Sequence, residues 1–298
     1  MRWLARVAAA VAVAAALSPV RERVAVTERF VDVGGGQILQ PPVIFVHGTF
    51  HSAWCWSERW LPRFSEAHGL EVHALSLRGT SPSPCADAKV TVRQHADDVL
   101  AATEALLGSD WRASFVAHSF GGPVLFDLLD RRHFRANAQS VSLLCSVPPS
   151  GNGGMTRRVV FRSPIDAFRI TRAFAMKTAC SDIQDAQRVF FGGQLEEGTC
   201  LQYMAKFKAD STVGLDLGDY MRTLPTPEKG GRARWLAEDD LPKISVFGAE
   251  LDFIVDEEAV LETANFVGAE ARFFPAAPHD VMLCDDDDAM ADAVARAL

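Results

Sequence analysis

The sequence predicts an α/β protein in which helices flank a mainly parallel central sheet and a helical cap is inserted into the sheet domain. Short apolar, β-branched runs alternate with segments of helical periodicity. This alternation is typical of a parallel sheet that is covered on both faces. It stops after Cys145 and resumes at Lys243. So long an interruption predicts an inserted unit, because a loop of that length is uncommon in a compact domain.

The strands are expected where apolar runs are short and rich in Val, Ile and Phe, as in buried strands. These runs are 24–33, 43–46, 71–77, 113–117, 141–145, 244–247 and 271–274. Helices are expected at 91–107 and 123–129, where apolar residues recur with helical spacing. Three consecutive glycines at 34–36 predict a hairpin between the two opening strands.

The domain organisation follows from the same patterns. We expect an α/β core made of residues 24–145 and 243–298, with the helical cap at 146–241. Within the cap, helical segments are expected at 165–179, 182–190, 202–209 and 219–224. Four acidic residues at 285–288 precede a carboxyl-terminal helix, whose positive end they would stabilise.

The amino-terminal segment 1–17 has the composition of a targeting segment. Arg2 and Arg6 precede an uninterrupted apolar run of 11 residues at 7–17, whereas a membrane-spanning helix needs about 18 to 20. We therefore expect no integral membrane span. A transit peptide would direct the protein to a plastid or another organelle, and a signal peptide to the secretory pathway is the alternative. An uncleaved alanine-rich helix packed on the domain is a third interpretation.

The composition excludes several classes of protein. The 298 residues include 30 Lys and Arg against 38 Asp and Glu, a net charge of −8, which argues against a nucleic-acid partner. A hydrophobic share of 48% is typical of a globular domain. Six cysteines are too sparse for a disulfide scaffold. Cys180 and Cys200 would pair across the cap only in an oxidising compartment, and in a plastid or the cytosol we expect free thiols.

The strongest local motif is AHSFG at 117–121, between an apolar strand and a helical pattern. It has the form of a nucleophile elbow, in which a sharp strand-to-helix turn exposes a serine hydroxyl above the sheet. Small residues must lie two positions before and two after the serine, and Ala117 and Gly121 meet that requirement around Ser119. Ser119 is therefore the candidate nucleophile.

An upstream strand ends in His47 and Gly48, followed by a tight loop. An acyl-transfer enzyme of this architecture places its second oxyanion donor there. We expect the oxyanion hole to consist of two backbone N–H groups, from Phe120 after the nucleophile and from Thr49, with Phe50 as the reserve. His47 and His51 are four residues apart, but they lie on a strand end and a loop rather than on a helix, so a zinc site is weakly indicated.

The base and the acid are expected in loops after the last two strands, where catalytic groups gather in open parallel sheets. His279 follows the last strand and is the candidate base. Asp252 follows the strand before it and is the candidate acid, with Glu250 as the competitor. The order Ser119, Asp252, His279 is that of the α/β-hydrolase fold. His118 adjoins the nucleophile and is expected to support the elbow.

The motifs resemble those of α/β-hydrolases, and within them the plant and algal, often plastid-predicted, hydrolase-like proteins. The resemblance runs from about Pro41 to the carboxyl terminus. It is carried by VHGTFHSAWCW at 46–56, HSFGG at 118–122, CSVPPSGN at 145–152, GAELDFIVD at 248–256 and PHDVML at 278–283. The HGTFHSAWCW stretch is also similar to plant methylesterases and hydroxynitrile lyases. The resemblance implies Ser119 as nucleophile, Asp252 as acid and His279 as base. It does not identify a substrate, because this fold hosts many activities.

The sequence therefore predicts a serine hydrolase that cleaves a small-molecule carboxylic ester, with lipid esters and thioesters in the same class. We expect no cofactor and no metal. The alternatives on the same residues are a hydroxynitrile-lyase-like enzyme, an acyltransferase, or a small-ligand receptor with little turnover. Phe50 and Trp54 are the candidate substrate-pocket residues, with ordinary core packing as the other interpretation.

Overall fold

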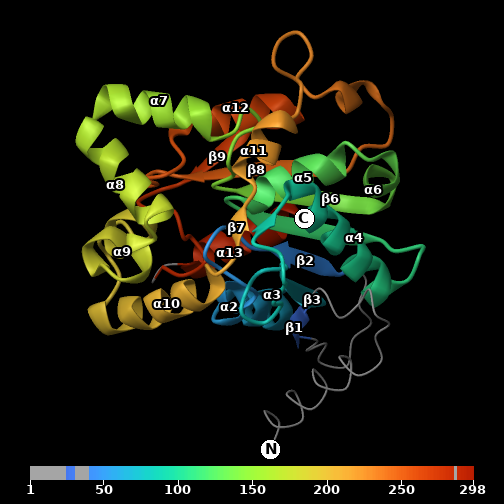
Figure 1. Cartoon of the computed structure of the whole chain (residues 1–298). Helices are drawn as coiled ribbons and strands as arrows, with labels where there is room; N and C mark the ends of the chain where they lie inside the picture. Colours follow the sequence, from blue (N-terminus) through green and yellow to red (C-terminus); the bar gives the residue numbers. More distant parts are fainter. Residues whose placement is uncertain (1–24, 31–39, 285–286) are drawn as a thin grey trace, which may run out of the picture.

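Seven strands form the central sheet of the part of the chain that the computed structural model describes, which is residues 25–30, 40–284 and 287–298. The strand order is β1-β3-β2-β5-β6-β8-β9 (Figure 1). These strands are β1 (Ala25–Phe30), β2 (Val43–Val46), β3 (Val72–Ser76), β5 (Ala113–His118), β6 (Ala138–Leu144), β8 (Lys243–Ala249) and β9 (Ala271–Phe274). All neighbouring strands run parallel except β1, which pairs antiparallel with β3.

The expected hairpin between the two opening strands is wrong in its pairing. The strand β1 lies beside β3, because both edges of β2 are taken by the parallel strands β3 and β5. The glycines at 34–36 and the expected targeting segment 1–17 lie outside the described residues. Within those residues, the helices are all too short or too polar to cross a membrane.

The sheet separates two apolar cores, and alternate residues of each strand face opposite sides. In β2, Val43 and Phe45 face one core, whereas Ile44 and Val46 face the other. This two-sided burial explains why the strand is apolar throughout. The first core holds α2 (Trp54–Ser57), α3 (Trp60–His68) and α13 (Asp287–Ala297). The second holds α4 (Val92–Leu107), α5 (Gly121–Leu129), α6 (Arg132–Asn137) and α12 (Glu257–Val267).

A helical segment lies between β6 and β8, and Figure 1 shows its helices α7 to α10 at the left of the molecule. It contains α7 (Asn152–Arg162), α8 (Pro164–Ala175), η2 (Thr178–Cys180), α9 (Ile183–Phe190), α10 (Glu197–Asp210), α11 (Leu217–Arg222) and η3 (Arg234–Ala237). Helix α7 departs from the sequence expectation, because only Met155 and Val159 along it are buried and its apolar periodicity is weak. The segment also holds a short strand, β7 (Gly214–Leu215), which pairs parallel with β4 (Lys89–Val90).

The cysteines are six free thiols. Cys200 is fully buried on α10, and Cys180 is partly buried at the end of η2. The two residues that an oxidising compartment would favour for pairing are therefore unpaired in this structure.

Helix α4 begins with a capping box, which ties the helix start to its own first turn. The Thr91 hydroxyl accepts a hydrogen bond from the Gln94 N–H (3.1 Å), and the Gln94 side-chain oxygen accepts one from the Thr91 N–H (2.9 Å).

Replacing Thr91 with Ala removes one half of this capping box. We expect Thr91→Ala to lower the free energy of unfolding by about 1 kcal/mol, measured by urea denaturation. Thr226→Ala is the control, since this exposed threonine makes no hydrogen bond with the described residues and should change stability little. An equal loss in both variants would contradict the capping role.

Candidate active site

Ser119 occupies a strained turn between β5 and α5. Its φ angle is 52°, in the left-handed region that residues with side chains rarely adopt. Three backbone hydrogen bonds hold it there. The Ser119 N–H donates to the Leu144 carbonyl (2.9 Å), and the Ser119 carbonyl accepts from the N–H groups of Gly122 (3.0 Å) and Val147 (3.1 Å). The AHSFG motif at 117–121 therefore forms a sharp turn between a strand and a helix, as the sequence predicts.

The glycine at position 121 allows the elbow to approach β2 closely. A Cβ atom added to Gly121 would lie 2.8 Å from the Val46 carbonyl oxygen and 3.0 Å from the His47 carbonyl oxygen. These are backbone atoms in the centre of the sheet, so they cannot move aside. The same added atom would lie 3.3 Å from the Cβ of Ala117. A small residue is therefore required on both sides of the serine, and Ala117 is small enough to replace the usual glycine.

The structure brings together the three residues that were expected to form a triad. His279 Nε2 lies 3.0 Å from the Ser119 Oγ, and His279 Nδ1 lies 2.7 Å from Asp252 Oδ2. Asp252 is held in place by the N–H groups of Ile254 and Val255, each 2.8 Å from Oδ1. Glu250, the competing acid, is exposed and accepts a hydrogen bond from a backbone N–H in the loop after β9 instead. A histidine that is oriented by a carboxylate and lies next to a serine hydroxyl has the geometry of nucleophilic catalysis.

The electrostatics around His279 favour its role as a proton acceptor near neutral pH. Burial of the ring acts to lower the pKa of His279, but the Asp252 carboxylate and then Asp280 outweigh burial and hold this pKa above the ordinary histidine value. His279 and Asp252 are both almost fully shielded from solvent as side chains. The two carboxylates therefore stabilise the imidazolium that forms when the serine proton is taken.

His47 sets the direction of one expected oxyanion donor. Its Nε2 accepts a hydrogen bond from the Leu77 N–H (3.0 Å), so its Nδ1 carries the proton and donates to the Gly48 carbonyl (2.8 Å). Burial lowers the pKa of His47 to about 4, which keeps this ring neutral. The Gly48 carbonyl and the Thr49 N–H share one planar peptide group and point in opposite directions. Fixing the carbonyl therefore fixes the Thr49 N–H.

A buried histidine and aspartate pair orients the next peptide group, and the sequence patterns did not indicate this pair. His51 Nδ1 donates to the Thr49 carbonyl (2.7 Å), which fixes the Phe50 N–H, the reserve oxyanion donor. His51 Nε2 lies 3.0 Å from Asp280 Oδ2, and both side chains are shielded from solvent. Burial acts to raise the pKa of Asp280, but His51, His118 and His279 together lower it. The only sequence signal was a carboxylate directly after the candidate base.

All four ring nitrogens of His47 and His51 are therefore occupied by hydrogen bonds to the protein. The i, i+4 spacing that weakly indicated a zinc site instead serves the loop after β2. Each histidine holds one carbonyl of this loop, and the two carbonyls belong to consecutive peptide groups.

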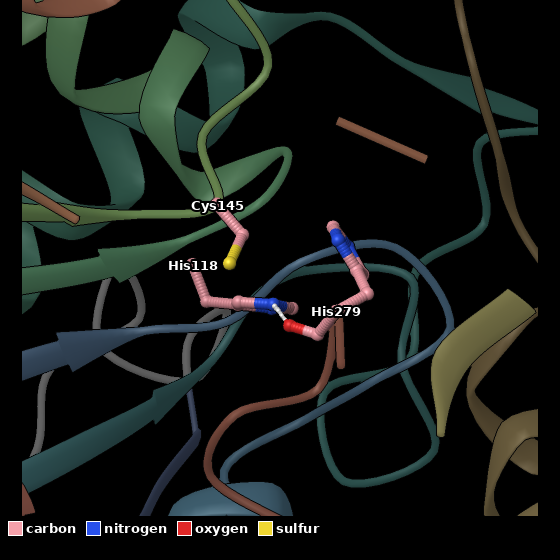
Figure 2. Close-up of side chains that lie close together, drawn as sticks. All are labelled: His118, Cys145 and His279. Carbon is pink, nitrogen blue, oxygen red and sulfur yellow. Dashed lines mark hydrogen bonds between the residues drawn. The ribbon is translucent and has the colours of Figure 1, made fainter. Parts of the chain in front are cut away.

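His118, Cys145 and His279 form a second buried cluster, which Figure 2 shows. Their ligand atoms lie within 4.8 Å of one another, a spacing that a metal ion could bridge. However, His118 Nε2 donates to the His279 carbonyl (2.9 Å), and both ring nitrogens of His279 are engaged by the triad. Burial, and then the nearby Asp252, raise the pKa of the Cys145 thiol well above its ordinary value, so it stays protonated. The cluster supports the backbone of the base rather than a metal centre.

The nucleophile opens into a cavity of about 480 Å³, a size typical of small-molecule sites. Ser119, Phe120 and the loop after β2 line one side of it, and α7 and α8 line the other. Most lining side chains are apolar, among them Phe50, Val147, Met155, Val159, Ile170, Phe174 and Ile254. Phe50 thus lines the cavity, as expected for a pocket residue.

Trp54 lies elsewhere, against α10. Its indole N–H donates to Asp210 Oδ2 (2.8 Å), and its ring stacks on Tyr203 with 5.4 Å between ring centres. It is not among the residues that line the cavity. Its contacts are those of a residue that joins the loop after β2 to the helical segment.

The family comparison agrees with this architecture. A family model described as the alpha/beta hydrolase family matches residues 43–297. Among curated proteins, none matches the chain. Solved structures do resemble it, and they include a hydrolase from Pseudomonas aeruginosa PA01, with 18% identity, a TM-score of 0.62 and coverage of 90% of this chain and 92% of that chain.

Two further solved structures have comparable similarity. A thermophilic esterase from Thermogutta terrifontis shares 18% identity, with a TM-score of 0.62 and coverage of 87% of this chain and 89% of that one. Est816, an N-acyl homoserine lactone degrading enzyme, shares 20% identity, with a TM-score of 0.58 and coverage of 86% and 93%. At such identities the similarity shows the fold alone. The predicted α/β-hydrolase fold is confirmed.

The close approach at the elbow can be tested by adding one methyl group. We expect Gly121→Ala to lower the free energy of unfolding by about 1 to 3 kcal/mol, because its Cβ meets two backbone carbonyls. Gly153→Ala on α7 is the matched control. Its Cβ would have no neighbour within 4 Å, so the change should leave stability unaltered or raise it by up to about 1 kcal/mol. Urea denaturation measures both, and a Gly121→Ala protein as stable as the wild type would contradict the tight crossing.

Proposed function

Because the chain belongs to the α/β-hydrolase family, we propose that it is a serine hydrolase that cleaves a carboxylic ester through an acyl-enzyme. One observation carries the proposal. Ser119 Oγ lies 3.0 Å from His279 Nε2, and the opposite nitrogen of the same ring lies 2.7 Å from Asp252. Ser119 also lines an apolar cavity, so its hydroxyl is both activated and accessible to a small molecule.

The reaction follows from these positions. His279 Nε2 takes the proton of Ser119 while Oγ attacks the ester carbonyl carbon, and the C–O double bond becomes a single bond to an oxyanion. The N–H groups of Thr49 and Phe120 donate to this oxyanion. The intermediate collapses as the bond to the alcohol breaks, and the alcohol leaves with the proton from His279. Water, deprotonated by His279, then attacks the acyl carbon. The bond between this carbon and Ser119 Oγ breaks, His279 returns the proton to Oγ, and the acid leaves.

The cavity supports a substrate with a large apolar group. Aliphatic and aromatic side chains from both the sheet domain and the helices α7 and α8 surround the space next to Ser119. The Arg78 guanidinium at this cavity is held by a bidentate ion pair with Asp98, which neutralises its charge. Esters with a medium or long acyl chain fit such a site better than esters of charged acids. The narrower resemblance to plant and algal hydrolases and to methylesterases stays a prediction, as does the organellar address.

The first test compares the nucleophile and the two carboxylates. Ser119→Ala should abolish labelling by a fluorophosphonate and the hydrolysis of p-nitrophenyl esters, because no other group replaces the hydroxyl. Asp252→Asn should lower kcat by about a thousandfold or more, since the base loses its orientation and its counter-charge. Glu250→Gln is the matched control and should retain activity. Hydrolysis retained in pure Ser119→Ala, or a larger loss in Glu250→Gln than in Asp252→Asn, would contradict the assignment.

The second test is the pH dependence of kcat/KM. Activity requires neutral His279, whose pKa is held above the ordinary value of 6.5 by Asp252 and Asp280 against burial. Activity should therefore fall as the pH decreases through a midpoint above 6.5. In Asp252→Asn this midpoint should move to lower pH, because the neutral amide no longer stabilises the imidazolium. Glu250→Gln should leave it in place. A midpoint that is the same in the wild type and Asp252→Asn would contradict the role of His279 as the titrating base.

A further inference from the structure

Large apolar side chains are exposed together where α7 meets α8. We define the α7–α8 corner as Val160, Phe161, Ile165 and Phe168, and exposed Met176 lies at the far end of α8. Phe161 is 83% exposed, Met176 70%, Ile165 65% and Phe168 64%. The described residues contain ten strongly exposed large apolar side chains, and five of them lie in this stretch of 17 residues. Single exposed apolar residues are ordinary, but a group of this kind marks a surface that contacts another apolar phase.

The corner is not a misplaced part of the core, because α8 has a separate buried face. Ala167 and Ala173 are buried, and Ile170 and Phe174 line the cavity next to Ser119. Ile165, Phe168 and Met176 lie on the opposite face, since three, eight and eleven residues separate them along a helix of 3.6 residues per turn. Figure 1 shows α7 and α8 meeting at the outer edge of the molecule, away from the sheet. The exposed group therefore projects outward.

The segment that carries the corner is basic, although the whole chain is acidic. Residues 150–177 contain six basic residues and one acidic residue, Asp166, a net charge of +5, whereas the chain carries −8. Arg158, Arg169 and Arg172 form ion pairs with carboxylates. Arg157 and Arg162 are exposed on α7 and form no ion pair with the described residues, and Arg162 is near enough to Asp256 to lower the pKa of that carboxyl. Cations next to an exposed apolar group complement a surface that is anionic outside and apolar beneath.

We propose that the α7–α8 corner binds the surface of an anionic lipid bilayer, with Phe161, Ile165 and Phe168 inserted among the acyl chains. This is the chemistry of interfacial helices, in which apolar side chains enter the headgroup boundary and arginines contact lipid phosphates. A second copy of the chain fits this surface less well, because the arginines that form no ion pair would face each other across such a contact. The basic residues thus select an anionic lipid over self-association.

The corner is coupled to the cavity through the same two helices. Met155 and Val159 of α7 and Ile170 and Phe174 of α8 line the cavity on their inner side. A bilayer bound to the outer side would therefore lie one helix away from the nucleophile. The substrate class that follows is an ester dissolved in the lipid. This last step rests on the proposed hydrolase function, whereas the lipid contact does not.

The lipid contact is tested by a probe placed on the corner of the full chain. An NBD fluorophore attached at Phe161→Cys should shift to shorter wavelength and gain intensity several-fold with phosphatidylcholine vesicles containing 30% phosphatidylglycerol. It should change little with pure phosphatidylcholine, and 1 M salt should reverse the effect. NBD at Leu261→Cys is the matched control, since Leu261 is 48% exposed on α12, and the wild type carried through labelling gives the background. No shift, or an equal shift at both sites, would overturn the proposal.

Charge and apolar variants separate this contact from the chemistry. Phe161→Ser with Phe168→Ser, and separately Arg157→Gln with Arg162→Gln, should each reduce co-sedimentation with the anionic vesicles about tenfold. Leu261→Ser should not. Fluorophosphonate labelling and hydrolysis of a soluble p-nitrophenyl ester should stay unchanged in all of them, while hydrolysis of a vesicle-dissolved ester should fall. Vesicle binding without any fluorophosphonate labelling would leave the lipid contact standing and overturn the hydrolase function. Dimerisation through the corner without lipid would overturn the lipid contact.

Discussion

The active site depends on how closely the turn after β5 crosses the end of β2. Only a hydrogen atom at position 121 fits between the turn and the carbonyl groups of Val46 and His47. This contact brings the nucleophile next to the loop after β2, which holds the second expected oxyanion donor. A Cβ added to Gly48 would in turn lie 2.8 Å from the Cβ of Ser119. Two glycines from distant parts of the chain thus set the distance between the hydroxyl and the groups that would stabilise its intermediate.

The hydrogen bonds near this crossing locate the ring protons of two histidines, His47 and His118. His47 is a neutral donor and acceptor, whereas His118 donates to the backbone of the base, and burial and then His279 lower the pKa of His118 to about 3. His51 faces two acceptors, a carbonyl and a carboxylate. The result is a set of oriented hydrogen-bonded groups near the triad, which includes the buried contact between His51 and Asp280. Pre-oriented groups of this kind stabilise developing charge without reorganising during the reaction.

The sequence was sufficient for the parts of this architecture that depend on local patterns. The strand at 271–274 has the expected bounds, and the helix expected at 91–107 begins one residue later, at Val92, and ends at Leu107, because its apolar residues recur with helical spacing. The placement of β1 beside β3 could not be predicted, because strand neighbours depend on the whole sheet rather than on chain order. Helix α7 has too few buried residues for a periodic signal. Ser119, Asp252 and His279 come together because each follows a strand in the same sheet edge. The contact of His51 with Asp280 has no local signature.

The contact between His51 and Asp280 joins residues that are 229 positions apart. One of them belongs to the first parallel strand and its loop, and the other follows the last strand. During synthesis the amino-terminal part of the chain is made first, and β2 can pair with β3 and β5 long before β9 exists. The peptide group between Thr49 and Phe50 is held by His51, and His51 gains its second partner only once Asp280 is in place. A nascent chain would therefore hold the elbow while it still lacks the base His279 and the contact that orients the reserve donor, so the site becomes complete only when the last loop is made.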